Sequence, residues 1–217
     1  MIENPEKYIE HTNLKPGITH KDVEKLISEA EHYKFHGICI PPFWVKKAAR
    51  DLQGSEVKLV TVIGFPFGYN MTETKERETE LAIRDGADEI DLVWSLTAFK
   101  AEMIWPKIEI VKIAKVCHES EKILKVIIET PLLNELEIAE ASKICVDAGA
   151  DFVKTATGFN GPAKVSDVEI IKKSIPDHVE IKASAGIKTP EQFEAMIKAG
   201  ATRIGTSSGV EIINNYQ

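Results

Sequence analysis

Gly149-Ala150-Asp151-Phe152-Val153 is the stretch that decides the fold, because the chain contains its pattern three times. Gly86-Ala87-Asp88-Glu89-Ile90 and Gly200-Ala201-Thr202-Arg203-Ile204 share this pattern, and each follows a helix-like segment and opens a β-like run. Glycine commonly stands just past the end of a helix, and a short turn commonly links a helix to a strand. The repeat therefore predicts a chain that alternates helices with strands.

Eight β-like runs follow one another at intervals of about 20–40 residues, the length of one strand–helix unit. They fall at Tyr8–His11, Gly37–Ile40, Lys58–Gly64, Glu89–Trp94, Ile123–Glu129, Phe152–Thr155, Val179–Ala183 and Arg203–Gly205. Strands that alternate with helices form a parallel sheet. Eight units in 217 residues favour an α/β fold, a (β/α)8 TIM barrel, with residues 1–217 as a single domain. A doubly wound open sheet is the alternative.

The composition excludes several classes of protein. Hydrophobic residues make up 43% of the chain and charged residues 28%, which is typical of a globular domain. The net charge of −7 argues against nucleic acid as a partner. No apolar run approaches the roughly 18 residues of a membrane span, and the N-terminus lacks the order of a secretory signal. Cys39, Cys117 and Cys145 are widely spaced, which fits free thiols, so we expect a cytoplasmic protein without a membrane partner.

Two lysines and an aspartate lie near the ends of three β runs. Lys154 precedes a turn that contains Gly158, Lys182 has the same setting in the next run, and Asp91 lies in an earlier one. A buried lysine is costly unless it is paired or neutral, and a neutral amine can form a Schiff base with a carbonyl substrate. Two neighbouring ammonium groups disfavour each other's charge, so one of them titrates low. The set predicts imine chemistry, with a structural salt bridge as the alternative for either lysine alone.

Strand periodicity extends this set, because side chains two residues apart share a face of a strand. The barrel interior is then expected to hold Phe152 with Lys154, Glu89 and Val93 with Asp91, Glu180 and Ser184 with Lys182, and Lys125, Ile127 and Glu129 of the fifth run. The residues between them are apolar and should face helices: Ile90, Leu92, Val126, Ile128, Val153 and Ile181. Buried charges persist only when they are paired, so the pattern predicts a mixed network of lysines and carboxylates.

A Gly/Ser-rich loop after the last β run is a candidate anion site. Ser207 and Ser208 stand where backbone N–H groups at a helix start and serine hydroxyls can bind phosphate. Ala185 and Gly186, after the seventh run, are expected to line the same pocket, with Lys188 as a counter-ion. An ordinary serine helix cap and a solvated lysine are the alternatives.

The sequence gives no sign of a metal site or a cofactor. The six histidines show no ligand spacing, and there is no Cys-x-x-Cys pair. We therefore expect chemistry that uses neither.

Seven segments together resemble the deoxyribose-phosphate aldolase family. The pair at 152–159 (FVKTATGF) and 181–187 (IKASAGI) is the most specific part of the resemblance. The remaining likeness covers nearly the whole chain in the family's order: YIEHTNLKP at 8–16, GICIPPFWV at 37–45, GADEIDLV at 86–93, LKVIIET at 124–130 and GATRIGTSSG at 200–209.

The resemblance implies a class I aldolase on a (β/α)8 barrel that needs no metal. Its substrates would be a small phosphorylated sugar, 2-deoxy-D-ribose 5-phosphate, and the products acetaldehyde and D-glyceraldehyde 3-phosphate. It implies that Lys154 forms the Schiff base, that Lys182 lowers the pKa of Lys154, and that Asp91 relays protons through a water. By the same resemblance, the substrate pocket would contain Thr12, Leu14, Lys125 and Thr157, and the phosphate pocket Gly158, Ala185, Gly186, Ser207 and Ser208. The family also implies a homodimer or homotetramer.

The chain departs from the family pattern at positions outside the two lysines and Asp91. Glu10 stands where the family has aspartate, and Pro41 and Ser95 each replace a frequent asparagine. Ala185 replaces the first glycine of a pair, which places a Cβ where backbone approaches phosphate. Tyr216 is penultimate, and in some members a C-terminal tyrosine assists proton transfer.

Three other functions remain open from the residues. One is a Schiff-base barrel aldolase that acts on a different aldehyde. Another is a sugar-phosphate isomerase with Asp91 as the base, although proton abstraction does not need a second lysine. The third is a phosphosugar-binding protein without catalysis.

Overall fold

The eight strands of the computed structural model pair in parallel in the order of the chain and close on themselves, since β1 also pairs with β8. The structure describes residues 2–216. The strands are β1 Ile9–Thr12, β2 Gly37–Ile40, β3 Lys58–Ile63, β4 Glu89–Val93, β5 Ile123–Ile127, β6 Phe152–Lys154, β7 Glu180–Ser184 and β8 Arg203–Thr206. The predicted barrel is confirmed, and the open-sheet alternative is wrong because no edge strand remains among them.

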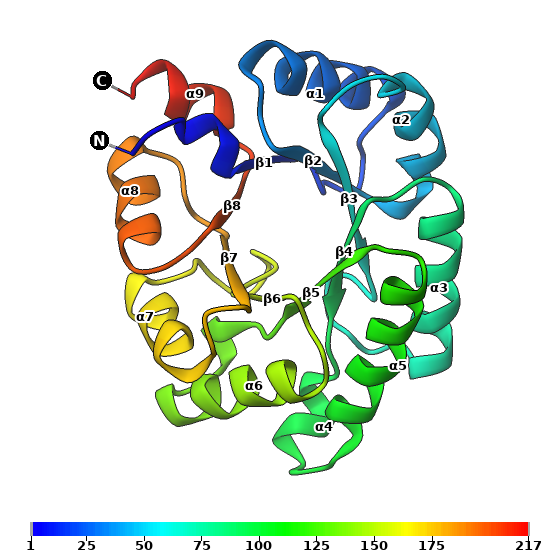
Figure 1. Ribbon diagram of the computed structural model, residues 1–217, viewed down its shortest axis with the longest axis vertical. Helices are drawn as coiled ribbons and strands as arrows, with labels where there is room; N and C mark the ends of the chain where they lie inside the picture. Colours follow the sequence, from blue (N-terminus) through cyan, green and yellow to red (C-terminus); the bar gives the residue numbers. More distant parts are fainter. Residues whose placement is uncertain (1, 217) are drawn as a thin grey trace.

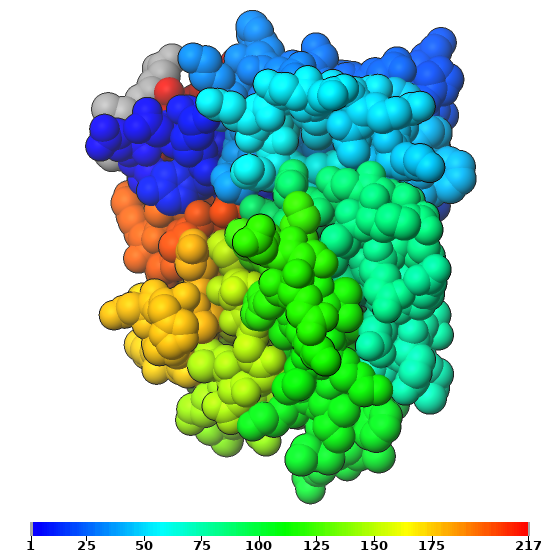
Figure 2. All heavy atoms as spheres, turned by 45° about the vertical axis from the view of Figure 1, so that its right-hand side comes forward, coloured from blue at the N-terminus to red at the C-terminus, as the bar shows by residue number. Residues whose placement is uncertain are grey.

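Helices surround the barrel in a ring, with both termini on one side of it (Figure 1). They are α1 His20–Tyr33, α2 Val45–Asp51, α3 Thr72–Arg84, α4 Leu96–Lys100, α5 Trp105–Glu119, α6 Glu135–Asp147, α7 Val165–Ser174, α8 Pro190–Lys198 and α9 Gly209–Asn214. Short 3₁₀ turns occur at Pro5–Tyr8, Pro42–Trp44 and Thr130–Leu132. The green segment around α4 projects at the lower edge of the molecule (Figures 1 and 2). None of the helices within residues 2–216 has the length and apolar character needed to cross a bilayer.

The repeated Gly-Ala-Asp pattern acts at the junction between a helix and the next strand. Gly86 and Gly149 follow α3 and α6 with φ of 112° and 87°, a backbone region that residues with a Cβ rarely adopt. The aspartates two residues later accept hydrogen bonds from the preceding strand. Asp88 accepts from the Leu59 N–H at 3.0 Å, and Asp151 accepts from the Leu124 N–H at 2.7 Å. One motif thus ends a helix and joins the next strand to its neighbour.

The alternation predicted from the sequence places the apolar residues as expected. The six intervening side chains are all buried in the main hydrophobic core: Ile90, Leu92, Val126, Ile128, Val153 and Ile181. The register of neighbouring strands then sets which interior residues lie side by side. Lys154 of β6 is paired with Lys182 of β7, and Lys182 with Arg203 of β8. Lys125 of β5 is paired with Asp91 of β4.

A buried ion pair fastens α3 to α5 outside the barrel. Lys75 Nζ lies 2.9 Å from Glu109 Oε1 and donates to the Val93 carbonyl at 2.9 Å. The same Glu109 oxygen accepts from the Ser95 N–H at 2.9 Å, at the end of β4. Burial lowers the pKa of Lys75 and raises that of Glu109, because both charges have lost water. The pair therefore holds the end of β4 at the cost of desolvating two charges.

Lys75→Met should lower the free energy of unfolding by about 3–5 kcal/mol, because it leaves the Glu109 carboxylate buried without its cation. Lys75→Met combined with Glu109→Leu should recover most of this loss, since no unpaired charge remains. Urea unfolding of the two variants and of the unchanged chain measures the difference. Equal losses in the single and double variants would show that the ion pair itself is what stabilises the helices.

Candidate active site

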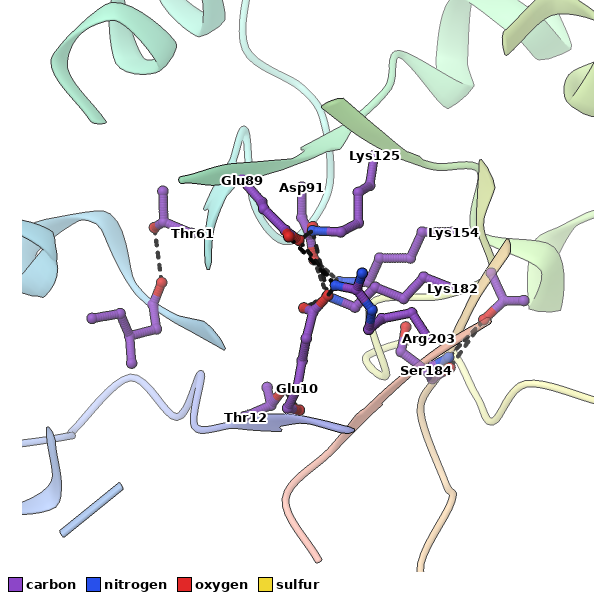
Figure 3. A network of polar contacts seen from close by, with 12 residues as sticks. Glu10, Thr12, Thr61, Glu89, Asp91, Lys125, Lys154, Lys182, Ser184 and Arg203 are labelled. Carbon is purple, nitrogen blue, oxygen red and sulfur yellow. Dashed lines mark hydrogen bonds and ion pairs between the residues drawn. The ribbon is translucent and has the colours of Figure 1, made fainter. Parts of the chain in front are cut away.

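Seven charged side chains meet in the interior of the barrel, and we call them the charge cluster. Its members are buried and come from six strands, β1, β4, β5, β6, β7 and β8: Glu10, Glu89, Asp91, Lys125, Lys154, Lys182 and Arg203. Figure 3 shows their charged ends pointing toward one another near the centre of the barrel. The mixed network expected from the alternation of the strands is confirmed.

Asp91 is the centre of the part of this cluster that lies nearer the carboxyl ends of the strands. Its Oδ2 accepts hydrogen bonds from Lys154 Nζ and Lys182 Nζ, each at 2.6 Å. Its Oδ1 accepts from Lys125 Nζ at 3.0 Å. One carboxylate thus holds three lysines, and the structure brings together the three residues that the sequence nominated for catalysis.

A second layer of charges, formed by Glu10, Glu89 and Arg203, lies next to Asp91 and its lysines. Lys125 Nζ lies 2.5 Å from a Glu89 oxygen, and Arg203 Nη1 lies 3.2 Å from the same oxygen. Arg203 also contacts Glu10 at 3.0 Å, and Lys182 is in contact with the other Glu10 oxygen. The three carboxylates of the cluster therefore each contact at least two cations.

The balance of charge in the cluster bears on the protonation state of Lys154. Its three carboxylates are matched by the other three cations when Lys154 is neutral, and a proton on Lys154 would add an unmatched positive charge. Burial is the largest cause that lowers the pKa of Lys154, Asp91 opposes it, and Lys182 adds to it. The predicted effect of Lys182 has the right sign, but loss of water is the larger cause.

The partners of Lys154 are held in their charged forms. Burial disfavours the Asp91 carboxylate, but Lys125, Lys154 and Lys182 outweigh it and hold the pKa of Asp91 well below its usual range. Burial likewise opposes the Lys182 ammonium, yet Asp91 and Glu10 raise the pKa of that lysine above its ordinary value. Lys154 is therefore the lysine of this pair with the lowered pKa.

A cavity of about 360 Å³ opens above Lys154 at the carboxyl ends of the strands. It is lined by eight of the other residues that the sequence proposed for substrate and phosphate: Thr12, Leu14, Thr157, Gly158, Ala185, Gly186, Lys188 and Ser207. Asp91, Lys125 and Lys182 lie beneath its floor and have no exposed surface. Ser208 is not among the lining residues, and its N–H donates to Thr206 Oγ1 at 2.9 Å.

The backbone on the β6 and β7 side of this cavity is turned by residues with positive φ. Gly158, Ala185 and Gly186 have φ of 92°, 84° and 78°. A Cβ on Gly186 would lie 2.6 Å from Pro162 Cβ, so only glycine fits there. Ala185 adopts the same left-handed region with a methyl group, which costs roughly 1–2 kcal/mol relative to an ordinary conformation.

Some functional contacts were not predicted from the sequence. Strand alternation could have indicated Glu10 and Arg203, because each lies two residues before a residue that lines the cavity, Thr12 and Gly205 respectively. His36 Nε2 lies 3.0 Å from Glu89 Oε1 at the start of β2, and no local pattern indicated it.

Two acidic residues assigned to the interior are placed differently. Glu180 is exposed rather than inside. It lies two residues before Lys182, whose partner Arg203 is the first residue of β8, so Glu180 extends beyond the start of that neighbouring strand. Glu129 lies beyond the end of β5, in a left-handed conformation, where it accepts a 2.6 Å bond from Thr157 Oγ1. It therefore positions a residue of the cavity wall.

Cys39 adds a possible metal donor beside the cluster. Its sulfur and the carboxylates of Glu10 and Asp91 come within 4.8 Å of one another. Both carboxylates already bind lysine ammonium groups, and burial raises the pKa of the Cys39 thiol to about 11. A cation would have to displace the lysines and meet a protonated thiol, so this arrangement does not fit a metal.

Tyr216 is held away from the cavity. Its hydroxyl accepts a 2.7 Å bond from the Ile2 N–H and donates a 2.8 Å bond to Glu194 on α8. Its ring packs against Phe193 at 5.8 Å. These contacts tie the last helix to the first residues of the chain.

Comparison with known proteins agrees with this geometry. Residues 7–215 match the family model described as DeoC/LacD family aldolase. A deoxyribose-phosphate aldolase from Mycoplasmopsis pulmonis is 48% identical over 97% of this chain and 96% of its own length. A solved structure described as QR15, an aldolase, has a TM-score of 0.94 at 41% identity and covers 99% of this chain and 96% of that one. The tetrameric deoxyribose phosphate aldolase from Aeropyrum pernix has a TM-score of 0.91 at 31% identity, covering 98% of this chain and 90% of that one.

The charge cluster should make the stability of the fold depend on pH. Lys125 and Arg203 help to hold the pKa of Glu89 below its usual value against the opposing effect of burial. A carboxylate with a lowered pKa stabilises the fold above its unfolded pKa, near 4.3, and this stabilisation is lost as the pH falls further. Glu89→Gln should therefore be less stable at pH 7, but its stability should fall less steeply below about pH 4, by up to roughly 1.4 kcal/mol per pH unit.

Chemical unfolding at a series of pH values tests this expectation. Glu140→Gln, which changes an exposed glutamate on α6, is the matched control and should follow the unchanged chain. Parallel curves for Glu89→Gln and the unchanged chain would contradict the role given to Glu89.

Proposed function

Since this chain belongs to the DeoC/LacD family of aldolases, we propose that it reversibly cleaves 2-deoxy-D-ribose 5-phosphate to acetaldehyde and D-glyceraldehyde 3-phosphate. The observation that carries the proposal is a lysine with a lowered pKa at the floor of a cavity, 2.6 Å from a carboxylate that also holds a second, protonated lysine. The domain proposed for this activity is the whole chain, residues 1–217.

The reaction begins with the neutral amine of Lys154. It attacks the aldehyde carbon of the open-chain sugar, and loss of water gives an iminium. The iminium is the electron sink, so no metal or cofactor is needed in this scheme. It places a positive charge beside Asp91 Oδ2, whose carboxylate stabilises that charge in a buried setting.

Cleavage then returns the cluster to charge balance. The bond between C2 and C3 breaks, its electron pair forms a double bond between C1 and C2, and the C=N electron pair moves to nitrogen. The resulting enamine is neutral. The C3 hydroxyl gives its proton to a bound water as C3 becomes an aldehyde. A proton returned to C2 then restores an iminium, and water hydrolyses it to release acetaldehyde and free Lys154. Asp91 is a weak base because three lysines hold it, so we assign it a relay through a water rather than direct removal of the proton. Lys182 keeps its proton and favours the neutral amine of Lys154.

The cavity walls supply the binding contacts of this scheme. We assign the phosphate to the wall formed by Gly158, Ala185, Gly186 and Ser207, with Lys188 at its edge. Ser208 contributes through its place in the same turn. The sugar would contact Thr12, Leu14 and Thr157, the last of which is oriented by Glu129. Lys125 has no exposed surface, so its influence on the substrate acts through Asp91.

The geometry disfavours the other functions considered from the sequence. An isomerase needs a carboxylate free to accept a proton from carbon, whereas Asp91 has both oxygens bound by lysines. A binding protein has no use for a lysine whose pKa is lowered by burial. A Schiff-base aldolase with a different aldehyde remains the second candidate, because it would use the same cluster.

We also propose a cellular compartment and an oligomeric state for this enzyme. We place it in the cytoplasm, since Cys39, Cys117 and Cys145 are buried free thiols among the described residues. We propose a homodimer or homotetramer, as the relative from Aeropyrum pernix is tetrameric. Ile104 and Trp105, where α4 is followed by α5, are exposed and would offer an apolar contact between copies.

Borohydride reduction in the presence of acetaldehyde should attach an ethyl group to Lys154, because the imine formed by its neutral amine is reduced to a stable secondary amine. Peptide mapping by mass spectrometry locates the modified lysine. Lys154→Arg should give no adduct and no cleavage of the sugar phosphate. An adduct on Lys182 instead would reverse the assignment of the two lysines.

Lys182→Met should raise the pKa of Lys154, because it removes a neighbouring cation while keeping most of the aliphatic volume. The rate at pH 7 should fall tenfold or more, and part of the loss should return at higher pH as Lys154 loses its proton. The pH–rate profile of the variant measures both effects. Lys143→Met, on the exposed face of α6, is the control. An unshifted profile would mean that burial alone tunes Lys154.

A further inference from the structure

Glu129 differs from the other buried glutamates because it has no cation beside it. The buried glutamates among residues 2–216 are Glu10, Glu89, Glu109 and Glu129. The first three each contact a lysine ammonium group. No lysine, arginine or histidine nitrogen of the described residues lies within 4.0 Å of a Glu129 oxygen. Since buried charges persist when they are paired, Glu129 is a candidate partner for a cation from solution.

Two hydrogen bonds orient the Glu129 side chain without compensating its charge. Its Oε1 accepts from the Thr157 N–H at 3.2 Å, and its Oε2 accepts from Thr157 Oγ1 at 2.6 Å. Both donors are neutral groups. Glu129 is only 3% exposed, so water screens its charge weakly. The carboxylate therefore attracts positive charge from a fixed position.

A small cavity of about 200 Å³ opens beside this carboxylate. It lies among the segments that follow β3, β4, β5 and β6, and most of its lining side chains are aromatic or aliphatic. Among the described residues, Glu129 is the only charged one that lines it. The cavity thus has one negative charge and no positive charge in its wall.

Aromatic side chains form much of the wall of this cavity. Phe67 and Tyr69 stack on each other, with ring centres 5.2 Å apart and ring planes 22° apart. They are 44% and 77% exposed, so a ligand in the cavity can reach them. Trp94 is buried and is fixed by a 3.1 Å bond from its Nε1 to the Ile128 carbonyl. The faces of aromatic rings attract cations, so the rings and Glu129 favour the same kind of ligand.

The wall favours a cation covered by methyl groups over a metal ion or a primary ammonium. Ca²⁺ and Mg²⁺ take about six or more oxygen ligands, whereas the polar side chains beside Glu129 are mainly Thr97 and Asn160. A primary ammonium has N–H donors to satisfy, but both Glu129 oxygens already accept bonds from Thr157. A quaternary ammonium has no N–H donor and is bound through aromatic faces and a nearby negative charge.

We infer that this cavity binds a small quaternary ammonium ion of the choline type, with its charge beside Glu129 and its methyl groups against Phe67 and Tyr69. No member of the charge cluster lines the cavity, so the inference does not depend on the imine chemistry proposed for Lys154. The site nevertheless adjoins the cavity above Lys154, because Thr157, which bonds to Glu129, lines that cavity.

Saturation-transfer NMR on the methyl protons of choline tests this inference with the full chain. Choline chloride is titrated at a constant ionic strength that is maintained with sodium chloride, and its Kd should be about 1 mM or lower. The neutral alcohol 3,3-dimethylbutan-1-ol has the same shape without the charge, and it should bind about tenfold more weakly or worse. Equal binding of the two molecules, or no saturation by about 20 mM choline, would overturn the cation site.

Variants of the wall locate the bound choline. Glu129→Gln should weaken choline binding by about tenfold or more, because it removes the charge but keeps an oxygen that accepts from Thr157. Tyr69→Ser should weaken binding by about fivefold, whereas Tyr69→Phe keeps the ring and should bind choline like the unchanged chain. The exposure of Tyr69 means that neither change at this position disturbs the core.

Leu136→Ser is the matched control, because Leu136 is also exposed and does not line this cavity. It should leave choline binding unchanged. Full affinity in both Glu129→Gln and Tyr69→Ser would show that choline binds elsewhere and would overturn the assignment. Equal losses in Tyr69→Ser and Tyr69→Phe would contradict the role given to the aromatic ring.

Discussion

The requirement that charges inside the barrel be paired shapes the rest of this structure. A lysine ammonium without a partner is costly away from water, so each cation in the interior needs a carboxylate at hydrogen-bond distance. Asp91 satisfies this requirement for three lysines at once, and Glu10 and Glu89 complete the pairing below it. Because the carboxylates match three cations, the fourth is the one that can be neutral. The same constraint that permits the cluster to be buried thus favours the neutral amine that the proposed reaction requires of Lys154.

The charged groups of the cluster also differ in their access to the cavity. Lys154 lies at the top, where the cavity begins, while Asp91, Lys125 and Lys182 have no exposed surface. In the proposed reaction, substrate would therefore reach Lys154 without displacing the buried ions that lower its pKa. The apolar side chains of β2 and β3 bound the cluster on one side, where a second cavity of about 580 Å³ opens. A barrel can hold charged and apolar side chains in one interior because each strand contributes its own inward side chains.

Much of the fold was accessible from local sequence patterns. The Gly-Ala-Asp repeat acts within a few residues, through a positive φ at the glycine and a bond from the aspartate to the preceding strand. Strand alternation correctly placed Asp91, Lys154 and Lys182 inside and their apolar neighbours against helices. It failed for Glu180, because β8 begins opposite Lys182 and leaves the residue two positions earlier in β7 uncovered, which alternation within one strand does not show.

Local sequence patterns specified the order of strands and helices, many of the residues that face inward, and the strand ends that carry Asp91, Lys154 and Lys182. These follow from periods of two and 3.6 residues and from the conformational freedom of glycine, which are properties of short segments. Which charges meet depends on how the barrel closes. Glu10 and Arg203 lie 193 positions apart in the chain, yet closure of the barrel between β1 and β8 brings them to 3.0 Å. The lowered pKa of Lys154 depends on removal of water and on those distances, and the cavity beside β2 and β3 is lined by loops that follow four strands, β1, β2, β3 and β6. No periodicity of a short segment specifies the pKa of Lys154 or this cavity, because both arise from contacts between segments that are distant in sequence.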